Sequence, residues 1–530
     1  MISVNQVAYE SSAVKHATLR GATHYILHDA KDSIVLEGDA KPVSDENSGI
    51  DAACIDFSSV TEAGEYYFTD DSGDKSPRFS ISETPYKNLF RDAIRMLYFQ
   101  RCGMALEEKY AGKFAHAACH CGKARILGTE RFIELGGGWH DAGDYGRYVT
   151  AGAVAVAHLL YAYLGKPEAF ELSLDIPESG NGIPDILNEC RWELDWMLKM
   201  QEEDGSVHHK ATSMHFADFI MPEEDDLEVV VTPVSSLAAA DFAAIMSLAS
   251  RCFEKYDAAL AESYKAAALK AGEWLQANPA FLFENPKDVH TGTYEDMFDA
   301  DERLWAAAEL FILSGDRKWI FEMRRILELR VSLTALGWAD VGGLASLAVF
   351  GARESFPEDL VNKLKGTWLE EADRLRSVAE GNPYELAFHP YDFRWGSNMQ
   401  VLCNAMELLV AYELSGKESY RDTARFQLDY LLGRNAMDVS YVTGHGERAF
   451  RDPHNRPTVA DGIDEPIPGY VSGGPNYRPG DTAANKETLA GRGAMCCYVD
   501  DWRSYSTNEI TIYWNSPLVF VLAYLLDSSK

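Results

Sequence analysis

A change of pattern near residue 85 constrains the fold of this chain more than any other feature of its sequence. Before it, short apolar runs such as Tyr25-Ile26-Leu27 and Glu65-Tyr66-Tyr67-Phe68 alternate with turn-rich clusters such as Asp70-Asp71-Ser72-Gly73-Asp74. Strands of this length and spacing are typical of a β-sandwich. Thr84-Pro85 ends the pattern. We therefore predict a first domain over residues 1–84.

After residue 85 the apolar residues recur with the period of a helix. Two of the predicted helices end at a glycine turn, Ser314-Gly315-Asp316 and Ser415-Gly416-Lys417, as helices often do. A long series of helices joined by loops fits a helical barrel or toroid, which we predict over residues 85–530. The predicted helices are 88–100, 183–201, 236–250, 302–314, 399–415, 420–432 and a final helix from Leu518 to Leu526.

The charge balance limits the classes of partner. The chain has 49 basic and 82 acidic residues and a net charge of −33. Such a chain repels phosphate backbones and anionic membranes, so we expect no nucleic acid and no membrane as partners. We also expect no apolar run of membrane-spanning length. A solubilising surface explains the charge, and a cationic substrate is the alternative.

Cysteine usage and the N-terminal residues bear on the compartment. Nine cysteines are an odd number and a low density for 530 residues, which fits reduced thiols better than a disulfide framework. The start, Met1-Ile2-Ser3-Val4-Asn5-Gln6, has no basic or apolar secretory region. We expect a cytoplasmic protein. The oligomeric state is unknown from the sequence.

One glycine-rich loop carries two carboxylates three residues apart. Gly136-Gly137-Gly138-Trp139-His140 leads directly into Asp141-Ala142-Gly143-Asp144. Glycines allow backbone and substrate to approach closely, and two neighbouring carboxylates can orient one water and accept its proton. Taken alone, the Asp-x-Gly-Asp pattern also fits a turn or a calcium loop.

Two later motifs add groups that suit sugar chemistry. Glu509 stands among polar and aromatic residues after Tyr505 and is either an acid catalyst or a cap of the final helix. His454 and Arg456 lie two apart in a proline-bounded loop. Both can donate hydrogen bonds to sugar hydroxyls, and a structural salt-bridge loop is the alternative for this pair.

Together these motifs resemble the signatures of glycoside hydrolase family 9. The Asp141-Ala142-Gly143-Asp144 box is similar to the family's Asp-Ala-Gly-Asp, and the stretches around His454 and Glu509 are similar to its two longer signatures. The similar segments follow the family order over residues 86–530. Further family-like segments are Asn181-Gly182-Ile183-Pro184-Asp185, Asp301-Glu302-Arg303-Leu304-Trp305-Ala306-Ala307-Ala308-Glu309 and Trp395-Gly396-Ser397-Asn398.

Two segments at the front resemble the immunoglobulin-like module that precedes one branch of this family. They are Asn5-Gln6-Val7-Ala8-Tyr9 and Gly64-Glu65-Tyr66-Tyr67. The resemblance therefore implies a mainly α protein with an immunoglobulin-like β-sandwich followed by an (α/α)6 barrel. Two departures from the family pattern are Asn455, where many members have a second histidine, and the less familiar stretch Tyr477–Met495.

The resemblance implies an inverting β-glycosidase with assigned roles. Asp144 is the general base and Asp141 helps to hold the water. Glu509 is the general acid, which requires a raised pKa. Base and acid are expected roughly 6.5–9.5 Å apart, so that a water fits between them and the sugar. The residues expected to contact the substrate are His454, Arg456, Tyr505 and Trp395.

Cys102, Cys119, His120 and His140 form a possible zinc set beside the base. Thiolates and imidazoles suit tetrahedral zinc, but the spacing is not that of a zinc finger, so the ligands must meet through the fold. The resemblance implies a structural zinc with this ligand type, and buried thiols with a hydrogen-bonded histidine are the alternative. Calcium is common in the family, but its ligands are unknown here.

Three functions are open at this point. The first is exo-hydrolysis of short imported β-1,4-linked oligosaccharides in a pocket closed at one end. Its sugar is glucose or, as in a subgroup acting on chitosan oligosaccharides, glucosamine, with the acidic loop Asp461–Glu465 near the amino group. The second is endo-β-1,4-glucanase activity. The third is non-catalytic sugar binding, which the retention of Asp141, Asp144 and Glu509 opposes.

Overall fold

The computed structural model describes residues 1–526, which form two compact units. Unit 1 combines residues 1–96 with the chain from residue 369 onward, and unit 2 contains residues 97–368. The boundaries between the units fall inside helices α1 (Lys87–Phe99) and α10 (Glu358–Glu380). The predicted division at residues 84 and 85 follows the sequence pattern and stays a prediction.

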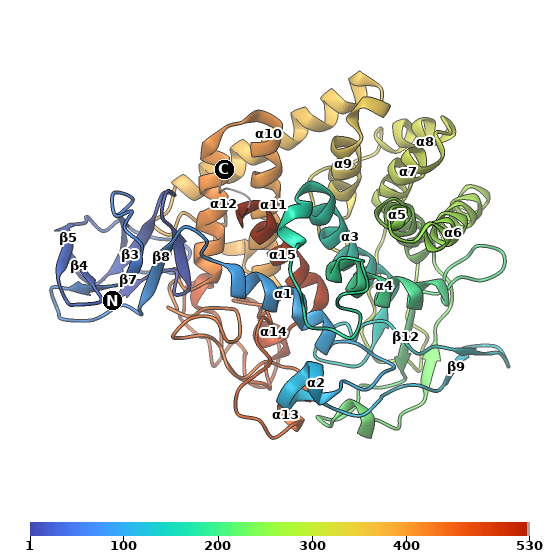
Figure 1. The fold of residues 1–530 in the computed structure, drawn as a ribbon, viewed down its shortest axis with the longest axis horizontal. Coiled ribbons are helices and arrows are strands. Elements are labelled where there is room, and N and C mark those ends of the chain that lie inside the picture. Colours follow the sequence, from blue (N-terminus) through green and yellow to red (C-terminus); the bar gives the residue numbers. More distant parts are fainter. Residues whose placement is uncertain (527–530) are drawn as a thin grey trace. The chain divides into compact units, whose positions relative to one another are not determined.

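Unit 1 begins with a two-sheet β-sandwich, drawn in blue in Figure 1. One sheet has the order β1-β3-β6, and the other has the order β2-β8-β7-β4-β5. Neighbouring strands are antiparallel except β2 and β8, which are parallel. The strands are β1 (Ile2–Ser3), β2 (Ala8–Glu10), β3 (His16–Arg20), β4 (His24–Asp29), β5 (Ile34–Asp39), β6 (Ala52–Asp56), β7 (Gly64–Asp70) and β8 (Phe79–Ser82).

The core of the sandwich comes from the alternation that the sequence shows. Strand β8 reads Phe-Ser-Ile-Ser, and its two apolar side chains, Phe79 and Ile81, are buried. They join Leu19 and Ile55 from the other sheet in one apolar cluster. Because side chains alternate across a strand, each sheet buries one face against the other.

Helices joined by long loops form the rest of unit 1. Helix α11 packs against both α12 and α15 (Figure 1). Two of the predicted helix ends are confirmed here and in unit 2, because Gly416 after α11 and Gly315 after α7 adopt left-handed backbone angles. The helices are α11 (Ser397–Ser415), α12 (Glu418–Leu431), α13 (Arg456–Ala460), α14 (Tyr505–Asn508) and α15 (Ile512–Leu526), with 3-10 turns at Pro390–Asp392 and Ala494–Cys496.

The last helix differs from its predicted start at Leu518. Helix α15 begins at Ile512 and contains Pro517. The hydroxyl of Thr511 accepts a hydrogen bond from the Trp514 amide at 3.1 Å, which is how a residue before a helix caps its first turn. The predicted start was wrong, because the helix already includes Ile512 to Pro517 ahead of Leu518. A proline inside a helix removes one backbone hydrogen bond and often bends the helix, but it does not always end it.

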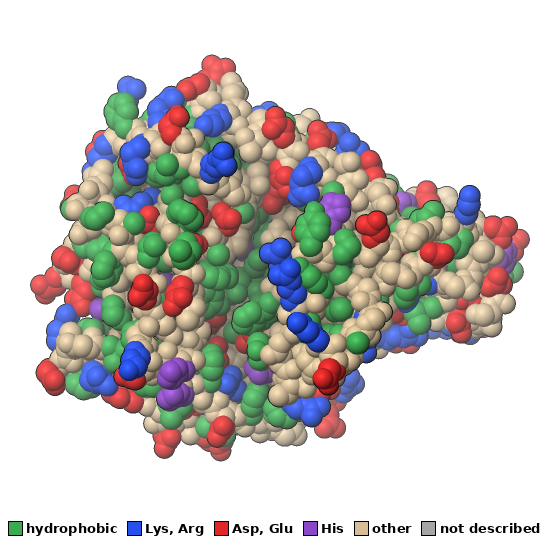
Figure 2. All heavy atoms as spheres, turned by 180° about the vertical axis from the view of Figure 1, so that it is seen from behind, with side chains coloured by type: hydrophobic (Ala, Val, Ile, Leu, Met, Phe, Trp, Pro, Cys, Tyr) green, Lys and Arg blue, Asp and Glu red, His purple; other side chains and the backbone are tan. Residues whose placement is uncertain are grey.

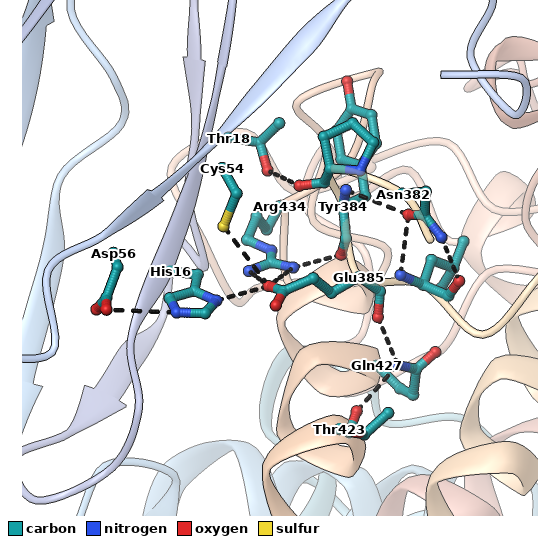
Figure 3. A network of polar contacts seen from close by, with 12 residues as sticks. His16, Thr18, Cys54, Asp56, Asn382, Tyr384, Glu385, Thr423, Gln427 and Arg434 are labelled. Carbon is teal, nitrogen blue, oxygen red and sulfur yellow. Dashed lines mark hydrogen bonds and ion pairs between the residues drawn. The ribbon is translucent and has the colours of Figure 1, made fainter. Parts of the chain in front are cut away.

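A polar network joins the sandwich to a loop of the same unit (Figure 3). Glu385 accepts from both terminal nitrogens of Arg434 at 3.0 Å, and it lies 2.6 Å from Nδ1 of His16 on β3. Arg434 is completely buried. Although burial raises the pKa of Glu385, Arg434 and His16 lower it below its ordinary value. The network therefore holds strand β3 against this loop with opposite charges.

Unit 2 packs its helices around α5. Helix α5 contacts α3, α6 and α7, and α7 also contacts α8 and α9. The helices are α2 (Glu108–Ala111), α3 (Val149–Gly165), α4 (Asp185–Leu198), α5 (Ser236–Phe253), α6 (Ala258–Ala277), α7 (Ala300–Ser314), α8 (Lys318–Ile326) and α9 (Gly342–Gly351), with 3-10 turns at Gly112–Phe114, Pro167–Phe170, Pro222–Glu224 and Arg353–Ser355.

A small mixed sheet in unit 2 frames the loop that carries the predicted base. Its order is β10-β9-β13-β12-β11. The loop from Leu135 to Gly146 joins β10 to β11, and α3 begins directly after β11. The strands are β9 (Lys123–Ile126), β10 (Phe132–Glu134), β11 (Arg147–Tyr148), β12 (Lys210–Ser213) and β13 (Val229–Val231).

Helix α5 departs from the expectation that no apolar run has membrane-spanning length. By length and composition, the helix Ser236–Phe253 could cross a membrane, and it is the one such helix among the described residues. The structure buries 94% of that window. A helix with neighbours on all sides is apolar all round, which the sequence pattern does not separate from a membrane helix.

Candidate active site

The loop of Asp141 and Asp144 folds back on itself. The Asp141 amide donates to the Gly146 carbonyl at 2.9 Å, and the Gly146 amide donates to Oδ2 of Asp144 at 3.1 Å. Gly146 is required here, because a Cβ at that position would lie 2.8 Å from the Asp144 carboxylate. Gln100 donates to the carbonyls of His140 and Ala142. Both carboxylates are buried and their backbone is fixed at each side.

The glycines before this loop allow close packing against α4. A Cβ on Gly138 would lie 2.8 Å from the Trp196 ring, and its φ of +79° suits glycine. The next amide, of Trp139, donates to the carboxylate of Glu193 at 2.6 Å. Burial raises the pKa of Glu193 to about 8. The glycine run thus lets helix α4 pack directly against the segment that precedes Asp141 and Asp144.

The surroundings of Asp141 favour the protonated form of its carboxyl. The Tyr294 hydroxyl donates to its Oδ2 at 2.5 Å, and Oδ1 has no hydrogen-bond partner among residues 1–526. Burial and the charge of Asp144 raise the pKa of Asp141 well above its ordinary range, and the bond from Tyr294 opposes them. A carboxyl with this setting can hold or share the proton of a bound water.

Strand β12 anchors the segment that carries Tyr294. Lys210 donates from Nζ to the Gly292 carbonyl at 2.5 Å and lies 3.2 Å from the Thr291 hydroxyl. Burial lowers the pKa of Lys210 to about 7, although Asp144 and Glu295 act in the opposite direction. Sequence reasoning missed Lys210 and Tyr294, because both lie far along the chain from Asp141 and in no recognisable motif.

The four predicted zinc ligands come together in unit 2. One ligand atom from each of Cys102, Cys119, His120 and His140 lies within 4.8 Å of the others. Nε2 of His120 contacts the Asp225 carboxylate at 3.1 Å, while its buried Nδ1 has no hydrogen-bond partner among residues 1–526. This leaves Nδ1 available for the cluster, in the carboxylate–histidine arrangement common at metal sites.

Electrostatics in this cluster favour a thiolate. Although burial raises the pKa of Cys102, the contact with Cys119 and the nearby Arg147 and His140 lower it well below its ordinary value. Thiolates and imidazoles at this separation match the donor set of a closed zinc site. Among residues 1–526 the second cluster with metal-ligand spacing is His16, Cys54 and Glu385. Neither is the oxygen-rich set that calcium prefers.

Glu509 lies in unit 1, directly after α14. Its carbonyl accepts from the Gly473 amide at 2.8 Å, and the His454 amide donates to the Asn508 carbonyl at 2.9 Å. His454 and Glu509 are therefore paired as in a parallel bridge. Thr511, rather than Glu509, directly precedes α15, and its hydroxyl accepts from the Trp514 amide in the first turn of that helix.

Asp481 holds the start of the helix that leads to Glu509. Its Oδ2 accepts from the Ser504 hydroxyl at 2.9 Å and from the amide and hydroxyl of Ser506 at 2.9 and 2.5 Å. Burial raises the pKa of Asp481, but these hydrogen bonds lower it below its ordinary value. Sequence reasoning missed Asp481, which no motif distinguishes from other loop aspartates.

Three of the predicted substrate contacts form one aromatic group. The Trp395 and Tyr505 rings meet edge to face with centroids 5.7 Å apart, and the His454 ring lies 6.1 Å from that of Tyr505. Trp395 is 57% exposed and Tyr505 39% exposed. Exposed aromatic faces of this kind can stack on sugar rings.

Arg456, the fourth predicted contact, is the first residue of α13 and is buried. The preceding residue, Asn455, caps this helix, because its side chain accepts from the Thr458 amide at 3.2 Å. Asparagine is a favoured N-cap residue. The departure from the family's second histidine therefore has a local structural role.

Two family models match this chain, one over the β-sandwich and one over the helical part that follows it. The family model described as glycosyl hydrolase family 9 matches residues 86–522, and the one described as cellulase N-terminal ig-like domain matches residues 1–75. This chain belongs to glycoside hydrolase family 9. A relative named cellodextrinase, from Butyrivibrio fibrisolvens, is 42% identical over 550 residues that cover 99% of this chain and 100% of that protein.

Solved structures of family 9 enzymes agree with this. An endoglucanase mutant from Alicyclobacillus acidocaldarius has a TM-score of 0.93 and 37% identity, with 99% of each chain covered. A zinc-binding triple mutant of a family 9 endoglucanase has a TM-score of 0.92 and 31% identity, covering 98% of this chain and 100% of that one.

Membership confirms the predicted fold class and enzyme class. The chain is an O-glycosyl hydrolase of β-1,4-glucans, in which an immunoglobulin-like β-sandwich precedes an (α/α)6 barrel. Asp141 and Asp144 belong to unit 2, whereas Glu509, His454, Arg456, Tyr505 and Trp395 belong to unit 1. The roles of these residues and the spacing of base and acid stay predictions.

Proposed function

We propose that this enzyme acts from the chain ends of short cello-oligosaccharides and inverts the anomeric configuration. The observation that carries this proposal is the 42% identity to a cellodextrinase over nearly the full length of both proteins. The exposed pair Trp395 and Tyr505 gives a short oligosaccharide an aromatic surface.

In the proposed mechanism Asp144 accepts a proton from a water whose oxygen attacks the anomeric carbon. The bond from that carbon to the leaving oxygen breaks, and Glu509 donates its proton to this oxygen. Asp141, with its raised pKa and the Tyr294 hydrogen bond, orients the water beside Asp144. His454 and Arg456 bind hydroxyls of the sugar being cleaved.

Glucose units are the proposed substrate. The relatives described above carry names that refer to glucans, and none of these names mentions an amino sugar. The glucosamine part of the prediction therefore has no support from them. Asp461 accepts from the Ile463 amide at 2.8 Å, so the acidic loop at Asp461–Glu465 begins with a local turn.

Parallel assays of cellotetraose, a chitosan tetramer and soluble cellulose polymer test this proposal. We expect cellotetraose to be shortened from one end, with little fall in polymer viscosity. A rapid viscosity loss with mixed products would favour endoglucanase action, the activity named for the structure from Alicyclobacillus acidocaldarius. Faster hydrolysis of the chitosan tetramer would favour glucosamine.

We also propose that Cys102, Cys119, His120 and His140 hold a structural zinc. The donor set and its 4.8 Å separation fit the ion, and the name of one solved relative shows that a mutant of this family binds zinc. A zinc ion bound there would neutralise the thiolates and would fix His140, the residue before Asp141. Elemental analysis of protein purified without chelator tests this, and a zinc content near zero contradicts it.

A reducing compartment such as the cytoplasm is the proposed location. All nine cysteines are free thiols in the structure, and structural disulfides are rare in reducing compartments. Fractionation of the producing cells measures this directly, and recovery of the enzyme outside the cells contradicts it.

A further inference from the structure

One cavity in unit 1 lies outside the residues assigned to the active site. Its volume is about 600 Å³. We call it the Tyr391 pocket, and it is lined by Glu46, His389, Pro390, Tyr391, Tyr477, Pro479, Lys486, Leu489, Arg492, Ala494 and Cys497. Most of these residues belong to Tyr477–Met495 or adjoin it, and that stretch departs from the family pattern.

Aromatic rings give the pocket a surface on which a sugar can stack. Tyr391 is 56% exposed, and the His389 ring stacks against it with centroids 5.2 Å apart and planes at 23°. Tyr477 is half-buried in the same lining. Flat aromatic faces beside polar groups are a common way to hold a pyranose ring.

Two cations face the same cavity. Lys486 and Arg492 are exposed, and neither forms an ion pair with a carboxylate of residues 1–526. Glu46 is the one carboxylate in the lining. The pocket is thus cationic on a chain whose net charge is −33, while the face in Figure 2 shows acidic and basic side chains intermixed. Such a local excess of positive charge favours an anion.

The segment that carries these cations is built around a core of its own. Leu489 and Cys497 pack with Ala484, and Tyr477 packs against them. Arg492 donates from one terminal nitrogen toward the carbonyls of Cys496 and Tyr498 at 3.4 Å each. Its guanidinium is therefore placed by the backbone, with further N–H groups left for a ligand.

We propose that the Tyr391 pocket binds an anionic sugar, a pyranose that carries one carboxylate or phosphate group. The ring stacks on Tyr391, and the anion lies between Lys486 and Arg492. Pro479 lines the pocket, and the Gly480 carbonyl next to it accepts from the Tyr505 hydroxyl at 3.1 Å. The occupant therefore sits beside the aromatic group of the proposed substrate contacts. This binding does not depend on hydrolysis.

Calorimetric titration of the full chain with glucuronic acid, glucose 6-phosphate and glucose tests the proposal. We expect at least one of the two anionic sugars to bind more tightly than glucose. The double variant Lys486→Gln, Arg492→Gln should weaken that binding about tenfold or more, and added salt should weaken it too. The two anionic probes separate a carboxylate from a phosphate as the preferred group.

Matched controls make the result specific. Arg478→Gln removes a neighbouring cation that lies over the Tyr477 ring at 4.9 Å but does not line the pocket, so binding should be unchanged. Tyr391→Ala tests the stacking surface independently of charge. The double variant Lys486→Gln, Arg492→Gln should hydrolyse cellotetraose at an unchanged rate. Binding of both anionic sugars no better than glucose, equal binding by the double variant, or displacement by cellobiose would overturn the proposal.

Discussion

Glu385 and Asp141 are both largely buried carboxylates, but they have opposite surroundings. Glu385 lies against Arg434 and His16, and these cations lower its pKa although burial raises it. Among residues 1–526 no cation lowers the pKa of Asp141, and burial together with the charge of Asp144 raises that pKa well above the ordinary range. The surroundings of Glu385 in unit 1 therefore favour the charged carboxylate, whereas those of Asp141 in unit 2 favour the protonated carboxyl.

The difference separates a structural role from a chemical one. A cation that fully occupies a carboxylate removes it from proton exchange, whereas a neighbouring like charge makes proton transfer easier. Strongly perturbed groups with an unoccupied polar atom are therefore good functional candidates. Asp141 has such an atom in Oδ1, and Glu385 does not enter the proposed chemistry.

The largest effect should come from removing the base or the acid. We expect Asp144→Ala and Glu509→Ala each to lower turnover of cellotetraose by about 100-fold to 10,000-fold, with the circular dichroism spectrum unchanged. Glu385→Gln serves as the matched carboxylate control and should keep most of its turnover when folded. Near-normal rates in either active-site variant would refute the assigned roles.

Loss of the metal cluster should cost the most stability. Cys102→Ser is expected to abolish zinc retention and to lower the free energy of unfolding by several kcal/mol, because metal binding is linked to folding. Elemental analysis and thermal melting measure the two effects. Cys190→Ser, at a buried cysteine outside the cluster, should keep the zinc, and equal zinc loss in both variants would argue against the assigned ligands.

Removing the ion pair between Glu385 and Arg434 should lower the free energy of unfolding by less than loss of the metal cluster. Glu385→Gln leaves the buried Arg434 without its anion, and removing one partner of a buried pair costs about 3–5 kcal/mol. Part of Glu385 is exposed, so we expect the lower end of that range in chemical denaturation. A loss below about 1 kcal/mol, the range of surface ion pairs, would show that the pair contributes little.

Tyr294→Phe tests the role of the Asp141 carboxyl, to which the Tyr294 hydroxyl donates. It removes the hydrogen bond that opposes the raised pKa of Asp141, so that pKa should rise further and the acid limb of the pH profile should move to higher pH. We expect turnover to fall about tenfold, equivalent to about 1.4 kcal/mol. Tyr163→Phe, which removes a hydroxyl paired with Tyr256, should leave the profile in place.

The smallest expected effect concerns how the contact between His16 and Glu385 makes stability depend on pH. Burial lowers the pKa of His16, but contacts with Cys54 and Glu385 raise it to about 10. A raised histidine pKa stabilises the fold fully below the unfolded value of about 6.5. That stabilisation declines as the pH rises toward 10. The melting difference between wild type and His16→Gln should shrink over this range, and a constant difference would contradict the assignment.

Much of the local structure was predictable. Glycines after residues 314 and 415 ended helices as expected, and alternating apolar residues formed the sandwich strands. Such features depend on a few neighbouring residues and on fixed periodicities. The start of α15 was not predicted, since the sequence alone does not tell a proline inside a helix from a proline that precedes one.

The candidate site also contains residues that the sequence predicted and residues that it did not. Asp141, Asp144 and Glu509 stand in dense local motifs, so their chemistry could be proposed from the sequence. Tyr294 and Lys210 could not, because hydrogen bonds across such separations arise only when distant loops pack together.

By itself, the sequence determined the helical and strand periods, the two helix ends at Gly315 and Gly416, the carboxylate motifs and the family to which they belong. Only the tertiary structure decided which carboxylates meet cations and which are buried beside another acid. Burial and distance set a pKa, and neither exists before the chain has folded. The opposite states of Glu385 and Asp141 are therefore properties of the packed protein, although both residues are present in the printed sequence.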